Sequence, residues 1–200
     1  MNAPRLIAIL LTASLFASTL ILARASPSHL SVALDDLPFP TLARPMNDTS
    51  GSTRGCGSAE LVAIPRPTLP EPWHELLQPL EEECIDNEDP QLDAFRITAR
   101  LEPGAATLGG VPVLEISQYI SEMSYGESYR LDLPATQAII RLTALIQRRC
   151  LREQDDALSC RIDPGSSKDR LFIEAEGGGH VLEPADEAPG TTWYRRSFFD

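Results

Sequence analysis

The spacing of hydrophobic residues changes twice between residues 94 and 200, and this constrains the fold more than any other feature of the sequence. Residues 94–101, AFRITARL, alternate apolar and polar side chains, which is typical of a strand with one buried face. Residues 135–150 carry apolar side chains three and four positions apart, which predicts a helix with one apolar side. Alternation returns after the helix, so the pattern predicts one helix lying on a sheet.

Turn-forming residues divide the alternating parts into seven predicted strands. They are residues 94–101, 111–120 and 128–133 before the helix, and 158–163, 170–176, 180–184 and 191–199 after it. Most links between them are short, which favours antiparallel pairing. The predicted fold is α+β, a mainly antiparallel sheet in the order β-β-β-α-β-β-β-β with one long helix packed on it.

The first 25 residues predict an export signal. Arg5 precedes an apolar run over residues 6–22, and small residues stand at Ala23 and Ala25, which is the pattern of a secretory signal peptide cut after Ala25. An uncleaved transmembrane anchor is the alternative, because the run is nearly long enough to cross a bilayer core of about 30 Å. We expect a secreted protein, extracellular or, in a Gram-negative bacterium, periplasmic, with no membrane contact after cleavage.

Residues 26–69 are rich in proline, glycine, serine and threonine and show no sustained hydrophobic period. We therefore expect an extended or partly disordered arm, followed by a single disulfide-bonded domain over residues 70–200. Residues 73–84 have helical spacing that Pro79 interrupts, which predicts a kinked helix or two short helical pieces. The acidic run over residues 81–93 predicts a solvated face.

Four cysteines follow the predicted cleavage site: Cys56, Cys84, Cys150 and Cys160. An even number in an exported protein predicts two disulfides. We prefer the pairs Cys150–Cys160 and Cys56–Cys84, because the first pair encloses a short link between a predicted helix and strand. Zinc ligation by these cysteines is disfavoured because no C-x-x-C spacing occurs. No metal or cofactor is expected.

Acidic residues outnumber basic ones, 29 to 17, which gives a formal net charge of −12. A negative surface repels phosphate backbones and anionic lipids, and this argues against a nucleic-acid or membrane-surface function. A protein partner, including a basic one, is compatible with this charge. Asn47 begins an Asn-Asp-Thr triplet that matches the N-glycosylation acceptor pattern.

The last predicted strand is the strongest candidate for a partner-binding surface. Alternation places Trp193 and Arg195 on one face and Tyr194, Arg196 and Phe198 on the other. Tryptophan, tyrosine and arginine dominate protein-interface hot spots, so all five residues are candidates, with burial in the core as the alternative for either set. If the strand lies at the edge of the sheet, it is also open to pairing with a partner strand.

Three glycines at residues 177–179 precede His180. A phosphate-binding loop is excluded because no helical period follows, and a hairpin turn is predicted instead. His180 with Glu174 and Glu176 is the candidate set for general-base or paired-carboxylate hydrolysis. We favour His180 as an ordinary turn residue because no G-x-S-x-G nucleophile motif is present.

Together these features predict a secreted non-catalytic interaction protein, such as an inhibitor or a virulence effector that binds and modulates a target protein. A small secreted hydrolase that uses His180 and nearby carboxylates is the alternative. A structural protein of a bacterial envelope is a third hypothesis, because it would carry the same export signal.

Overall fold

The computed structural model of the chain describes residues 31–45, 61–85, 94–121, 124–153 and 160–199. The predicted signal peptide, the Asn47 acceptor site and Cys56 lie outside these residues. Within them, no helix is long and apolar enough to cross a membrane.

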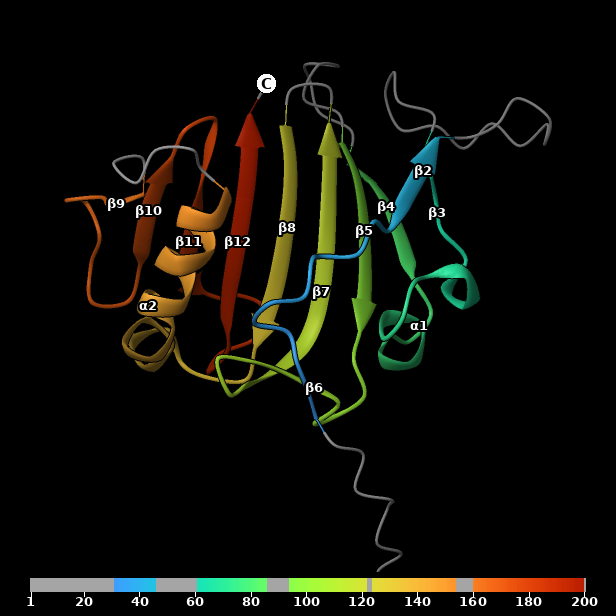
Figure 1. Cartoon of the computed structure of the whole chain (residues 1–200), viewed down its shortest axis with the longest axis horizontal. Coiled ribbons are helices and arrows are strands. Elements are labelled where there is room, and N and C mark those ends of the chain that lie inside the picture. Colours follow the sequence, from blue (N-terminus) through green and yellow to red (C-terminus); the bar gives the residue numbers. More distant parts are fainter. Residues whose placement is uncertain (1–30, 46–60, 86–93, 122–123, 154–159, 200) are drawn as a thin grey trace, which may run out of the picture.

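One large sheet forms the body of the protein (Figure 1). From edge to edge its antiparallel strands are β4 (Glu81–Ile85), β5 (Ala94–Arg100), β7 (Val111–Ser121), β8 (Ser124–Leu131), β12 (Thr192–Phe199), β11 (Gly178–Pro184), β10 (Leu171–Ala175) and β9 (Arg161–Ile162). β6 (Ala106–Leu108) pairs with the start of β7, and β1 (Val32–Ala33) pairs with β6 in parallel, which makes the sheet mixed. A separate two-stranded sheet contains β2 (Ala43–Pro45) and β3 (Leu61–Ala63).

A layer of helices and extended chain covers one face of the large sheet. The long helix α2 (Ala135–Glu153) contacts β10, β11 and β12. Residues 31–45 cross over the central strands, while the short helices η1 (Arg66–Thr68) and α1 (Trp73–Leu76) lie towards β5 (Figure 1). The opposite face carries no helix among the elements that the structure describes.

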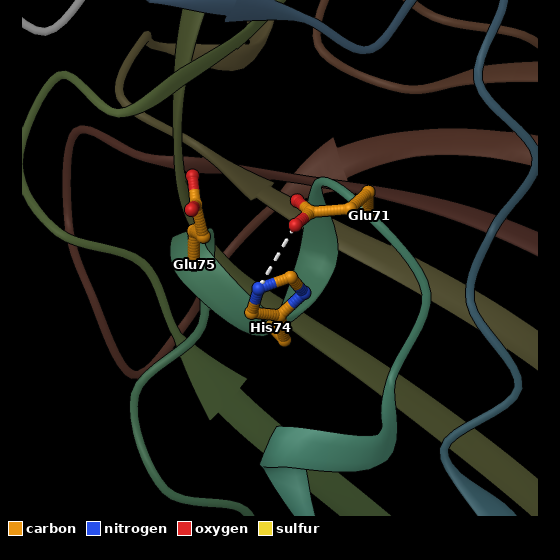
Figure 2. A group of neighbouring side chains, drawn as sticks. All are labelled: Glu71, His74 and Glu75. Atoms are coloured by element: carbon orange, nitrogen blue, oxygen red, sulfur yellow. Dashed lines mark ion pairs between the residues drawn. The ribbon is translucent and has the colours of Figure 1, made fainter.

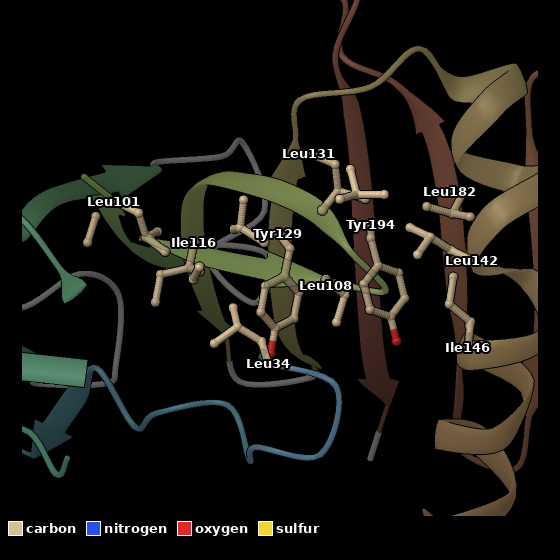
Figure 3. Close-up of a cluster of buried hydrophobic side chains, with 14 of the residues drawn as sticks. Leu34, Leu101, Leu108, Ile116, Tyr129, Leu131, Leu142, Ile146, Leu182 and Tyr194 are labelled. Atoms are coloured by element: carbon tan, nitrogen blue, oxygen red, sulfur yellow. The ribbon is translucent and has the colours of Figure 1, made fainter. Parts of the chain in front are cut away.

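The hydrophobic core lies between this layer and the sheet (Figure 3). Leu142 and Ile146 of α2 face Leu182 and Tyr194 of the sheet, and each of the four is at most 1% exposed. Full burial of one such aliphatic side chain contributes about 1.5–3 kcal/mol, so the apolar stripe of α2 supplies a large part of the driving force for this packing. The predicted α+β class is confirmed at this level, one long helix on a mainly antiparallel sheet.

Residues 31–45, part of the expected arm, are integrated into the domain. Leu34 and Leu42 are fully buried in the same core cluster as the residues of α2 and the sheet. Their backbone is extended, but the two leucines give the segment enough apolar surface to fix it on the sheet. The predicted boundary near residue 69 is therefore not a boundary of the hydrophobic core.

The predicted kinked helix is shorter than expected. α1 ends at Leu76, and residues 81–85 form strand β4 at the edge of the sheet. On β4, Glu83 accepts a hydrogen bond from Arg96 of β5 at 3.2 Å, so a cross-strand ion pair supports this acidic segment as a strand.

The last strand of the chain is not at an edge of the sheet, contrary to the expectation that it could accept a partner strand. β12 pairs with β8 along Thr192–Phe199 and with β11 along its other side. Its backbone groups are therefore occupied on both sides. The predicted strand over residues 128–133 begins earlier than expected, because Tyr125 and Gly126 lie within β8 and pair with Phe198 and Ser197.

The disulfide between Cys150 and Cys160 is confirmed, with a Cα–Cα distance of 5.9 Å. It joins the last turns of α2 to the chain just before β9. Cys84 is also disulfide-bonded. Because Cys56 lies outside the described residues, the pairing of Cys84 with Cys56 stays a prediction.

Candidate functional site

The five predicted partner-binding residues of β12 lie on opposite faces of the sheet. Tyr194 is buried against the helix layer, and Arg196 and Phe198 point to the same side. Trp193 and Arg195 point to the uncovered face, where the Arg195 side chain is 51% exposed. Of the five, Arg195 is therefore the residue that a partner on the uncovered face can reach most readily, because Trp193 is only 8% exposed.

A row of polar side chains crosses the covered face. Gln118 of β7, Glu127 of β8, Arg196 of β12 and His180 of β11 occupy directly opposed positions on four successive strands. Gln118, Glu127 and His180 are each less than 9% exposed. The row was not predicted from the sequence, because it requires the pairing of strands that are far apart in the chain.

Arg196 links this row to the end of α2. Its guanidinium contacts Glu127 at 3.1 Å and Glu153 of α2 at 2.8 Å. The Tyr125 hydroxyl donates a second hydrogen bond to Glu127 at 3.0 Å. Burial raises the pKa of Glu153, and the positive charge of Arg196 opposes that shift.

Gln118 of the row and Arg149 of α2 hold residues 31–45 over the row. The Gln118 side-chain oxygen accepts hydrogen bonds from the backbone N–H groups of Leu42 and Ala43, at 2.8 and 3.1 Å. Arg149 of α2 donates to the backbone carbonyl oxygens of Leu34 and Asp35. Because backbone groups buried without partners are costly, these contacts fix the path of the covering segment.

His180 is a buried strand residue, and its interpretation as a turn residue is wrong. The turn of this hairpin ends at Gly177, so residues 178–184 belong to β11. Its Nδ1 lies 2.9 Å from the Tyr194 hydroxyl, and its Nε2 lies 3.8 Å from Glu153. Burial, together with the charges of Arg196 and Arg149, lowers the pKa of His180 to about 4, so the imidazole is neutral near pH 7.

The candidate hydrolase residues do not converge. Glu174 is exposed and pairs opposite Gly179 on β11, which puts its side chain on the face away from His180. Glu176 lies in the turn before Gly177. The hydroxyl that does contact His180 belongs to Tyr194, whose pKa is raised by burial, so it is a poor nucleophile. The contacts of the row are hydrogen bonds and ion pairs, both within the sheet and to the layer that covers it.

The uncovered face has a hollow of about 530 Å³ at its centre. The hollow exists because four of the residues that line it are small and leave space between the larger side chains. These four are Ser117, Gly126, Ser128 and Ser197. Arg96, Tyr119, Trp193 and Arg195 are among the larger side chains that line it. It combines aromatic rings and guanidinium groups on a rigid sheet.

A second hollow of about 430 Å³ adjoins the first and shares Glu187 and Arg195 with it. Its lining includes four carboxylates, Asp169, Glu183, Asp186 and Glu187, against the two arginines Arg170 and Arg195. Glu183 contacts both arginines. The pKa of Asp169 is lowered by a hydrogen bond from Ser167, and that of Glu187 by backbone hydrogen bonding and the Trp193 indole. This hollow is therefore negatively charged at neutral pH.

Three groups that could ligate a metal ion meet on one turn at α1, namely Glu71, His74 and Glu75 (Figure 2). Their ligand atoms all lie within 4.8 Å of one another, and His74 Nε2 is 3.0 Å from a Glu71 carboxylate oxygen. Sequence reasoning considered this segment for its apolar spacing only. The available signal was a histidine with acids three residues before it and one residue after it.

Comparison with known proteins gave no relative: no family model, curated protein or solved structure matches the chain.

Proposed function

We propose that this protein is a secreted, non-catalytic binding module that engages a protein partner with a basic surface through the uncovered face of its large sheet. The observation that carries the proposal is the pair of adjoining hollows on this face. The two share Arg195 and Glu187 and together offer aromatic, guanidinium and carboxylate groups. Such side chains are enriched where protein interfaces bind most strongly.

The architecture supports a binding role because it presents a rigid platform. The covered face carries the whole hydrophobic core cluster, and the helix layer is fastened by buried polar contacts. The uncovered face contributes little to that core, so its side chains can serve recognition without loss of core packing. Pre-organised surfaces lose less conformational entropy when they bind.

The charge of the surface supports a basic partner. The chain has a net charge of −12, and the second hollow has two more carboxylates than arginines. Complementary charge accelerates encounter and penalises acidic competitors. The partner surface that fits this hollow has lysine or arginine side chains to pair with Asp169, Asp186 and Glu187.

The test is capture from extracellular or host material by residues 26–200 in oxidised form, followed by affinity measurement with the retained protein. Asp169→Lys with Asp186→Lys reverses two charges in the second hollow, at the half-buried Asp169 and the exposed Asp186. Glu82→Lys with Glu102→Lys makes the same change of net charge at exposed positions outside both hollows.

We expect the first double variant to bind at least about tenfold more weakly and the second to bind nearly as well as the wild type. Equal losses in both variants would show that only net charge matters and would refute the location. Retention of no protein, or of one without a basic surface, would refute the proposed function itself.

A further inference from the structure

We propose that Glu71, His74 and Glu75 form a surface binding site for a zinc ion. This site lies outside both hollows of the uncovered face, and it is independent of the proposed partner binding. The three residues come from a single turn at the start of α1 (Figure 2).

The turn that carries the ligands is firmly anchored. Trp73, Leu76 and Leu77 on its inner side are 2%, 7% and 1% exposed and belong to the hydrophobic core. The N–H groups of Leu76 and Leu77 donate to the carbonyl oxygens of Pro72 and Trp73 at 3.2 and 3.0 Å. The backbone positions of the ligands are therefore fixed before any ion binds, which reduces the entropy lost on binding.

The distances suit a small tetrahedral ion. Zinc binds imidazole nitrogen and carboxylate oxygen at about 2.0–2.2 Å, so two ligand atoms on one tetrahedral ion stand about 3.3–3.6 Å apart. His74 Nε2 and the Glu71 oxygen are already 3.0 Å apart. Glu75 completes the set, because its carboxylate lies within 4.8 Å of both and its side chain is exposed and able to rotate.

The kind of ligand selects the metal. Imidazole nitrogen and carboxylate oxygen are both zinc ligands, and three protein ligands leave the fourth position for water or for a partner group. Calcium and magnesium prefer oxygen ligands throughout, so the histidine favours zinc over both.

The local charge also favours a cation. Glu71 and Glu75 stand four residues apart on one turn, where like charges repel. Among the ion pairs of the described residues, neither carboxylate is paired with a lysine or an arginine. A divalent ion would remove the repulsion. The Glu71 side chain is 68% exposed and that of His74 is 32% exposed, so an ion can enter directly from solvent.

The experiment is calorimetric titration of the tag-free, chelator-treated oxidised protein with zinc chloride, and separately with magnesium chloride. We expect one zinc ion per chain and at least tenfold weaker binding of magnesium. Cobalt(II) should give the visible absorption of a tetrahedral site at the same stoichiometry.

His74→Ala and Glu75→Gln should each weaken zinc binding at least tenfold. The matched control Glu82→Gln, which removes an exposed charge from β4, should bind zinc like the wild type. Thermal unfolding of each apo variant checks that the fold is kept, and His74→Gln serves as a second variant. Zinc binding that survives the loss of His74, equal affinity for magnesium, or no zinc binding would each overturn the proposal.

Discussion

Replacement of Arg196 by methionine should destabilise the protein strongly, because it removes the only cation that contacts the buried Glu127 among the described ion pairs. In the folded protein Arg196 pairs with Glu127 and Glu153, whose side chains are 10% and 28% exposed. Loss of one partner of a buried ion pair costs about 3–5 kcal/mol, because the remaining charge is left without compensation. Glu127 keeps the hydrogen bond from Tyr125, and Glu153 is partly hydrated. We therefore expect a loss near the lower end, about 3 kcal/mol.

The matched control is Arg195→Met, the same change at the next residue of the same strand. The Arg195 side chain is 51% exposed and pairs with Glu183 at 3.0 Å, so its removal should cost about 0–1 kcal/mol. The free energy of unfolding is measured by urea denaturation at pH 7. The double variant Glu127→Gln with Arg196→Met removes both charges and should recover much of the loss. Equal losses for the two arginine variants, or a double variant no more stable than Arg196→Met, would refute this reasoning.

Three further changes test the fold. Gly109→Ala should lower the free energy of unfolding by about 2–4 kcal/mol, because its φ is +56° and a Cβ there would meet the buried Leu142 side chain at 2.4 Å. The control Gly110→Ala, at a φ of +72° with open space around the Cβ, should lower it by only about 1 kcal/mol in the same denaturation assay. Replacement of the Cys150–Cys160 disulfide by two alanines should lower the free energy of unfolding by about 2–3 kcal/mol, and an unchanged value would contradict a stabilising role. The His180 imidazole should titrate near pH 4 by NMR, and a midpoint near 6.5 would contradict its burial. Because this pKa lies below the value in the unfolded chain, the stability that the neutral imidazole contributes should be complete above about pH 6.5 and should decline as the pH falls towards 4.

Local pattern was sufficient to predict the elements but not their arrangement. The alternation in residues 94–101 and the helical stripe of α2 identified β5 and α2 nearly to the residue, because both signals depend on which side of one element is buried. The pairing of β8 with β12 joins segments more than 60 residues apart, and no turn chemistry specifies it. The strand β4 was missed because glutamate is depleted in strands, and its pairing with β5, which includes the ion pair with Arg96, is not visible in the local pattern.

For the candidate binding surfaces too, the local pattern predicted which side chains share a face but not where that face lies in the protein. Alternation correctly divided Trp193 and Arg195 from Tyr194, Arg196 and Phe198, but it could not say which face the helix would cover. His180 was misplaced because three preceding glycines resemble a loop, whereas two of them belong to β11. There, Gly178 has to be small, since a Cβ would lie 2.0 Å from the Ser197 carbonyl oxygen.

The central position of β12 makes the joining of the two halves of the sheet depend on one strand. Until residues 192–199 have left the ribosome, β8 and β11 have no common neighbour, and the sheet exists only as two separate halves with open inner edges. The contacts that join the halves span long stretches of chain, a topology associated with slow folding. A chain in which β12 has not yet paired exposes these two strand edges to aggregation. A chaperone that shields those edges should therefore raise the yield more than one that acts on the finished domain.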